Sequence, residues 1–170
     1  MQRSRLLLRS IERYSISLWS NILGSRFYLD VGDQVVLTKE VTADAINDFA
    51  RISGDFSPAH MSVEIMGRSP YKTRIAHGAL LVAWMSHCST EVVERLSGLR
   101  DAGETPVSLG YDRVRFLKAA LIGDTLTYTY RVQAVDQEKR RAVSKLEVVN
   151  QAGDLVCVAE HILKFVPLVD

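Results

Sequence analysis

The stretch His77-Gly78-Ala79-Leu80-Leu81-Val82-Ala83-Trp84-Met85 decides the fold. After the glycine almost every side chain is apolar, and the apolar pattern continues through Val92, Val93 and Leu96 before it stops near Gly98. A helix that is apolar on most of its sides is a buried helix. We therefore expect one long helix, starting after the glycine, at the centre of the protein.

Segments with the pattern of β-strands lie on both sides of this helix in the sequence. Within residues 125–132, threonines and an arginine alternate with Leu126, Tyr128, Tyr130 and Val132. This period of two is typical of a strand with one buried face. Val-rich segments bounded by Gly-Asp turns predict the other strands. The five expected strands are 31–40, 107–117, 125–136, 141–150 and 155–165.

A shorter helix follows the first strand. Thr42 can cap this helix, its apolar face contains Ile46 and Phe49, and Gly54 ends it. The next segment, 55–74, contains two prolines and a glycine and has no clear period, so we expect it to be irregular. The order of strand, short helix, loop, long helix and four strands predicts an α+β domain, in which an antiparallel sheet curls around the long helix.

Length and composition agree with one globular domain. A chain of 170 residues buries about 70% of its unfolded surface. The 47% apolar and 24% charged residues exclude a disordered, collagen-like or disulfide-scaffold chain. The formal net charge of +1 indicates no nucleic-acid partner, because such proteins carry a basic stripe. No apolar run approaches the ~18 residues of a membrane span.

Residues 1–27 differ in composition from the domain that we expect at 28–170. They contain five arginines and one acid, many serines, and apolar residues at helical spacing. This combination is typical of a mitochondrial transit peptide, and the alternative is a basic amphipathic extension that packs on the domain or on a second copy. Cys88 and Cys157 are far apart and are interpreted as buried thiols in a reducing compartment. We therefore expect a cytoplasmic protein, or a mitochondrial-matrix protein if the extension is a transit peptide.

The residues with chemical potential are concentrated around Gly54-Asp55-Phe56-Ser57-Pro58-Ala59-His60. This motif places a carboxylate and an imidazole five residues apart across a proline turn, and such a pair can share acid–base catalysis. His77-Gly78 follows at the start of the long helix. A glycine there allows close approach of a substrate, and its N–H lies at the positive end of the helix dipole.

These motifs resemble the MaoC-like family of (R)-specific enoyl-CoA hydratases and related dehydratases. The family motif Gly-Asp-x-Asn-Pro-x-His corresponds to G-D-F-S-P-A-H here, and its Ile-x-His-Gly stretch corresponds to I-A-H-G at 75–78. The segment V-R-F-L-K-A-A-L-I-G-D-T-L at 114–126 also resembles a family segment, and the likeness covers about residues 28–167. The resemblance implies a hotdog fold, reversible hydration of trans-2-enoyl thioesters to (R)-3-hydroxyacyl thioesters, and a homodimer.

The resemblance also implies roles for individual residues. Asp55 and His60 would be the catalytic pair, and the Gly78 N–H would stabilise the charge on the thioester oxygen. The implied substrate is an acyl-CoA or acyl-carrier-protein thioester, and no metal or redox cofactor is implied. A hotdog thioesterase and a non-catalytic thioester-binding subunit remain alternatives.

Three further residues are expected at the substrate. Ser57 stands where the family usually has asparagine, His77 orients the start of the long helix or lines the pocket, and Ser86 matches a family serine near the catalytic water. Arg74 stands where the family often has proline. Asp55, His60 and His77 could ligate a metal by residue type, but they lack a recognised ligand spacing, so no metal is expected. His87 and His161 are interpreted as packing or surface residues.

Overall fold

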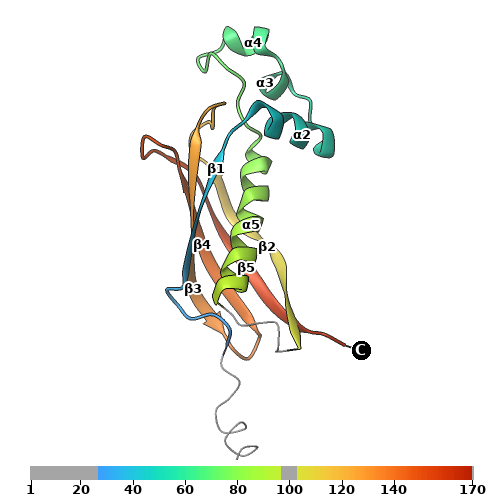
Figure 1. The fold of residues 1–170 in the computed structure, drawn as a ribbon, viewed down its shortest axis with the longest axis vertical. Helices are drawn as coiled ribbons and strands as arrows, with labels where there is room; N and C mark the ends of the chain where they lie inside the picture. The colour runs from blue at the N-terminus through green and yellow to red at the C-terminus, as the bar shows by residue number, and fades with distance from the viewer. Residues whose placement is uncertain (1–26, 97–102, 170) are drawn as a thin grey trace, which may run out of the picture.

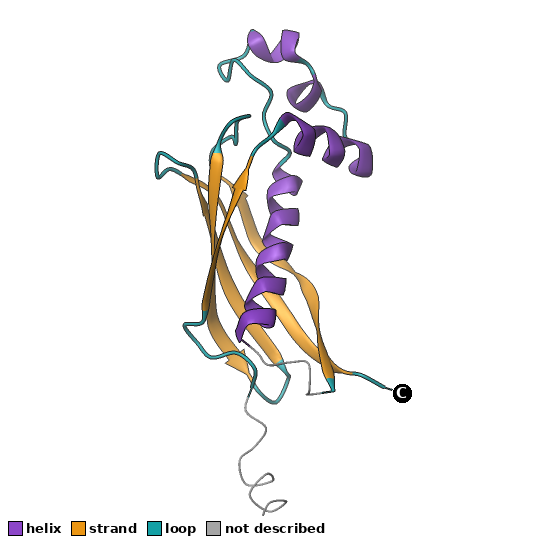
Figure 2. Cartoon of the chain, in the orientation of Figure 1, coloured by secondary structure: helices purple, strands orange, loops and turns teal. Residues whose placement is uncertain are grey.

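The computed structural model describes residues 27–96 and 103–169. Five antiparallel strands form one sheet in the order β1-β3-β4-β5-β2, and the 19-residue helix α5 (Gly78–Leu96) lies along one face of it (Figures 1 and 2). The strands are β1 (Gln34–Glu40), β2 (Glu104–Phe116), β3 (Thr125–Asp136), β4 (Arg141–Val149) and β5 (Leu155–Pro167). The expected α+β hotdog architecture, a sheet around one long helix, is confirmed.

The core lies between α5 and the inner face of the sheet. Met85, Cys88 and Val92 of α5 are fully buried, and they belong to the same core cluster as Tyr128 of β3. Burial follows the period of two that the sequence predicts for β3 and β4. The side of α5 that carries Ser86 and other small or polar residues is exposed, so the helix is not buried on every side.

Three short helices lie beyond one end of the sheet, next to the N-terminus of α5 (Figure 1). Helix α2 (Ala43–Ser53) begins at Thr42, whose Oγ1 accepts a hydrogen bond from the Ala45 N–H at 3.0 Å, and it ends at Gly54 in the left-handed conformation (φ 78°). The segment predicted to be irregular contains α3 (Pro58–Met61) and α4 (Val63–Gly67). That prediction was wrong there because four or five residues are too few to show a helical period.

A buried polar network lies within the apolar core. The imidazole of His161 on β5 is fully buried, with Nδ1 2.9 Å from the Tyr130 hydroxyl and Nε2 2.8 Å from the Ser108 hydroxyl. Its ring stacks on that of Tyr111, with the ring centroids 4.6 Å apart. Burial lowers the pKa of His161 to about 4, so this side chain stays neutral. His161 is thus a packing residue, and hydrogen bonds satisfy both of its nitrogens.

The amphipathic extension predicted at 1–27 lies, apart from its last residue, outside the described residues. That last residue, Phe27, belongs to the core, because it is buried and packs edge-on against Phe165 with the ring centroids 5.1 Å apart. Among the helices of the described ranges, none has the length and hydropathy that crossing a membrane requires.

An ionic cluster anchors the residues that precede β1. Glu104, the first residue of β2, accepts hydrogen bonds from the guanidinium of Arg140 and from the Tyr28 hydroxyl, the latter at 2.6 Å. The Arg140 guanidinium also lies over the rings of Phe27 and Tyr28, at 5.1 and 5.0 Å from their centroids. The cluster therefore joins the N-terminal segment, the start of β2 and the β3–β4 turn.

We expect this cluster to contribute stability that acid removes. The pKa of Glu104 is lowered, mainly by the hydrogen bonds from Arg140. A carboxylate with a lowered folded-state pKa stabilises the protein above its unfolded-state pKa, and this contribution disappears as pH falls through the folded-state value. Glu104→Gln should therefore reduce the free energy of unfolding by about 1–2 kcal/mol at neutral pH and by less in acid, in urea titrations.

The control is Glu147→Gln, which removes a carboxylate from an exposed pair with Lys145. This variant should change stability little at any pH, because exposed ion pairs contribute little. If both variants lose the same free energy of unfolding, or if the loss in Glu104→Gln does not depend on pH, the ionic cluster is not the source of the acid-sensitive stability.

Candidate active site

The loop between α2 and α3 positions the carboxylate of Asp55. Gly54 ends α2, Asp55 follows it, and the backbone N–H of Ser57 donates a hydrogen bond to Asp55 Oδ1 at 3.1 Å. This local turn orients the carboxylate, while 52% of the Asp55 side chain remains exposed. Ser57 is the N-cap residue of α3, but its hydroxyl makes no capping bond. Its backbone, and not its side chain, therefore contributes to the site geometry.

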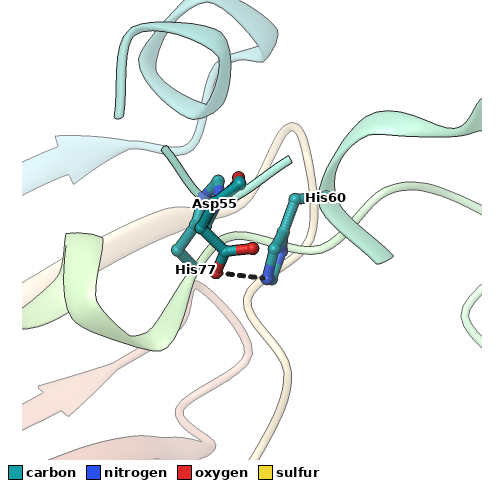
Figure 3. Close-up of side chains that lie close together, drawn as sticks. All are labelled: Asp55, His60 and His77. Carbon is teal, nitrogen blue, oxygen red and sulfur yellow. Dashed lines mark hydrogen bonds and ion pairs between the residues drawn. The ribbon is translucent and has the colours of Figure 1, made fainter. Parts of the chain in front are cut away.

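The imidazole of His60 faces this carboxylate from α3. Its Nδ1 lies 2.9 Å from the carbonyl oxygen of Ile75. Because a carbonyl only accepts, Nδ1 must carry the hydrogen, and Nε2 of the neutral ring has a free lone pair. Nε2 lies 3.9 Å from Asp55 Oδ2, and the side chain of His60 is only 14% exposed (Figure 3). The base form of His60 is thus directed toward Asp55, at a separation too long for a direct hydrogen bond.

His77 contacts both Asp55 and His60. It immediately precedes α5, is 2% exposed, and donates its Nε2 hydrogen to the backbone carbonyl of Asp55 at 2.9 Å. Its ring stacks on that of His60, with centroids 3.7 Å apart, and it contacts the ring of Phe49 on α2 at 4.9 Å. Figure 3 shows the three side chains gathered together. His77 therefore holds the Asp55 loop and the His60 ring in place.

Gly78, the next residue, begins α5. Its backbone N–H has no hydrogen-bond acceptor among the described residues. As the first N–H of a helix it lies at the positive end of the dipole, where a negative oxygen is stabilised. A Cβ at this position would lie 2.6 Å from the ring of Phe116, which is 54% exposed. The absence of a side chain therefore lets the Phe116 ring pack directly over the helix start.

Ser86 lies apart from this cluster. It is eight residues beyond Gly78 on α5, which corresponds to about 12 Å along the helix. The side chain of Tyr111 on β2 lies near it, but the buried Tyr111 hydroxyl makes no hydrogen bond with any described residue. Burial raises the pKa of Tyr111. Within the described residues, no hydrogen bond or ion pair joins Ser86 to Asp55 or His60, so Ser86 belongs to a different part of the helix surface.

The motif and the fold match those of known proteins. The family model described as "MaoC like domain" matches residues 30–153, which is most of the chain. The chain belongs to the MaoC-like family. The match includes the Asp55–His60 turn, the start of α5 and most of the sheet.

Two relatives and one solved structure show how close the likeness is. The 3-hydroxybutyryl-CoA dehydratase of Methylorubrum extorquens is 30% identical over 139 residues, which is 82% of this chain and 82% of that protein. The (R)-specific enoyl-CoA hydratase of Aeromonas caviae is 27% identical over 136 residues, 80% of this chain and 95% of that protein. A solved structure of an A. caviae (R)-hydratase superposes with a TM-score of 0.68 at 26% identity, covering 80% of this chain and 96% of the other.

The geometry of this MaoC-like site favours acid–base chemistry over metal ligation. Ligand atoms of Asp55, His60 and His77 lie within 4.8 Å of one another. However, the two imidazole rings are stacked with an angle of 27° between their planes, so their in-plane lone pairs lie in two nearly parallel layers. A tetrahedral metal needs donors that converge on one point.

The sequence motifs did not reveal some residues that shape the site. Ile75 accepts the His60 Nδ1 hydrogen through its carbonyl oxygen, and its N–H donates to the Ala59 carbonyl at 3.2 Å. Both contacts use backbone atoms, so the identity of the side chain does not reveal this role. Phe49 was recognised as part of the apolar face of α2, but its contact with His77 depends on the tertiary structure. Phe116 lies in the 114–126 segment that resembles the family, and its packing on Gly78 could not be inferred from that likeness.

We expect the effect of a side chain at Gly78 to depend on Phe116. Gly78→Ala should lower the free energy of unfolding by about 1–3 kcal/mol, because the new methyl group overlaps the ring. In a Phe116→Ala background the same change should raise it by about 0.5–1 kcal/mol, since alanine favours a helix more than glycine does. Chemical denaturation of the four proteins measures both effects.

Gly67→Ala on α4 is the matched control, because a Cβ there has no neighbour within 4 Å. It should be neutral or slightly stabilising. If Gly78→Ala costs as much without Phe116 as with it, overlap with the ring does not explain why this position is glycine.

Proposed function

We propose that the protein is a hydro-lyase that adds water reversibly to trans-2-enoyl thioesters and forms (R)-3-hydroxyacyl thioesters. The observation that carries this proposal is the 3.9 Å gap between His60 Nε2 and Asp55 Oδ2. One water molecule can hydrogen-bond to both atoms across such a gap. Family membership supports the hydro-lyase class, and the stereochemistry rests on the likeness to relatives named as (R)-specific hydratases.

The bound water would supply both parts of the addition. The lone pair of His60 Nε2 accepts one hydrogen of this water, and the Asp55 carboxylate accepts the other and orients the oxygen. As the oxygen bonds to C3 of the enoyl group, His60 takes the proton, and the imidazolium then returns it to C2. Because one base serves both steps from one side, the addition is syn. The elements of one water enter the product, and the enzyme returns to its initial protonation state.

The start of α5 would stabilise the charge that develops between these two steps. Attack at C3 moves electron density onto the thioester oxygen, and the unpartnered N–H of Gly78 can donate to that oxygen. Donors of this kind contribute about 3 kcal/mol in known oxyanion holes. Gly78 is adjacent to His77, which contacts both Asp55 and His60, so the oxyanion donor and the acid–base pair lie in one place. The thioester itself acidifies C2, and the mechanism assigns no step to a metal or redox cofactor.

We also propose that the active form is a homodimer. In the described part of the chain β1 and β2 are the two edges of the sheet, and β2 pairs with β5 alone. The exposed apolar residues of β2 include Leu109 and Phe116. A long edge strand with exposed apolar residues is normally covered by a partner, and a second copy would cover it by symmetry.

The acid–base pair can be tested by substitution. Asp55→Asn and His60→Gln should each lower kcat by at least ~10²-fold, as expected when a positioned acid–base group is removed. The measurement is loss of the ultraviolet absorbance of an enoyl-CoA, together with a thiol assay. Hydration bleaches the band without releasing thiol, a thioesterase releases thiol, and a binding subunit does neither.

Asp48→Asn is the control for charge, because Asp48 is an exposed carboxylate on α2 that pairs with Arg51 and not with the site. Its kcat should match that of the wild type. A folded Asp55 or His60 variant that keeps more than about a tenth of wild-type turnover would contradict the assignment of the pair. Such a variant would have lost far less activity than the removal of an acid–base group predicts.

Sedimentation equilibrium tests the homodimer. At micromolar concentration the measured mass should be twice the chain mass of 19.0 kDa. Leu109→Lys should shift the mass toward that of the monomer, because a charge at the β2 edge opposes edge pairing. A wild-type mass equal to that of a single chain would contradict the proposal.

A further inference from the structure

We propose that the loop 68–74, with the sequence R-S-P-Y-K-T-R, binds the nucleotide end of coenzyme A. The ligand chemistry is a cluster of phosphates joined to an adenine ring. This inference rests on the proposed function, because it concerns how the same site holds its thioester substrate. It predicts that the substrate is linked to coenzyme A and not to a carrier protein.

The loop is fixed to the catalytic turn at its C-terminal end. Its last residue precedes Ile75, whose carbonyl accepts the Nδ1 hydrogen of His60 and whose N–H donates to the Ala59 carbonyl. Ile75 also forms a β-bridge with Leu121, four residues before the start of β3. A ligand bound to the loop would therefore lie at a defined position relative to the acid–base pair.

The loop is also held internally, so its charged side chains project from an ordered backbone. The Ser69 hydroxyl donates to the Met66 carbonyl at 2.7 Å and accepts from the Tyr71 N–H at 3.2 Å. The Lys72 N–H donates to the Ser69 carbonyl, and Lys72 adopts a left-handed conformation with φ 60°. At the end of the loop the Arg74 guanidinium donates to the Asn47 side chain on α2 at 2.9 Å.

Positive charge on this loop is largely unbalanced. The seven residues include three cations and no acid. In residues 27–96 and 103–169, no ion pair or side-chain hydrogen bond involves Lys72. Arg68 has one exposed partner, Glu64, at the long distance of 3.7 Å, and such pairs contribute little. The partner of Arg74 is a neutral amide, which leaves its charge uncompensated. The local field therefore favours an anion with several charges.

An exposed aromatic ring lies within this set of cations. Tyr71 is 47% exposed, and no aromatic ring in the described part of the chain packs on it. A flat exposed ring is a platform for a nucleobase, and stacking of this kind contributes about 1–3 kcal/mol per base. Cations lie on both sides of Tyr71 in the sequence. A phosphoadenosine could place its phosphates against these cations while its adenine stacks on the Tyr71 ring. An acidic protein surface offers charge but no base to stack.

The test compares two thioesters that share an acyl group, crotonyl-CoA and crotonyl-pantetheine, which lacks the nucleotide. For the wild type, KM should be clearly higher for crotonyl-pantetheine than for crotonyl-CoA. The KM ratio is the KM for crotonyl-pantetheine divided by the KM for crotonyl-CoA. Lys72→Gln should reduce this ratio about threefold, and the double variant Arg68→Gln with Lys72→Gln should reduce it about tenfold. Glutamine is shorter than lysine or arginine but stays polar and has a similar backbone preference, so the main change is the loss of the charge.

Lys139→Gln is the matched control, because Lys139 is an exposed lysine on the β3–β4 turn that pairs with Asp136. It should leave the KM ratio unchanged. Tyr71→Leu should reduce the ratio as well, since leucine keeps apolar area but removes the stacking face. A loss of folded enzyme lowers the maximum rate with both substrates but leaves KM unchanged, so it does not produce the result.

The outcomes separate failure of this inference from failure of the proposed function. If the wild type hydrates neither thioester, the proposed function fails. If it hydrates both with the same KM, or if Lys72→Gln raises KM equally for both, the nucleotide site does not exist. A third substrate, crotonyl acyl carrier protein, tests the other source of anionic charge. If a variant raises the KM for crotonyl acyl carrier protein but leaves the KM ratio of crotonyl-pantetheine to crotonyl-CoA unchanged, the assignment to a nucleotide is overturned.

Discussion

The structure depends first on the burial of α5 against the sheet. Met85, Cys88 and Val92 are fully buried, and full burial of an apolar side chain such as methionine contributes roughly 1.5–3 kcal/mol. One helix can bury such a face only if the sheet curves around it, and the strand order places β4 at the centre of that sheet. The rest of the fold, including the position of the site, follows from where this helix begins.

The candidate site is built where the first turn of α5 meets the loop that follows α2. Three contacts to backbone groups hold it together: His77 to the Asp55 carbonyl, His60 to the Ile75 carbonyl, and the Ser57 N–H to the Asp55 carboxylate. Each of these contacts uses a polar atom that would otherwise be left without a partner at a helix end or in a loop. The same bonds that satisfy the backbone therefore also orient the acid–base groups.

Much of the fold was accessible from the sequence because its signals are local. The period of two in β3, the apolar run of α5, and the Thr42 and Gly54 end signals of α2 all correspond to elements of the structure. Helices α3 and α4 were missed because they are shorter than the pattern that identifies a helix.

What the sequence determined by itself is the set of chemical groups: a carboxylate and an imidazole on a proline turn, and a glycine that opens a buried helix. Their order and spacing are properties of the chain and can be read without coordinates. Only the tertiary structure decided that Nε2 of His60 is the free nitrogen, that the His77 ring stacks on that of His60, and that the Phe116 ring packs over Gly78. These features depend on contacts between residues 15 to 38 positions apart, such as His60 with Ile75 and Gly78 with Phe116. Local periodicity contains no information about such contacts, because they form only when the helix and sheet pack.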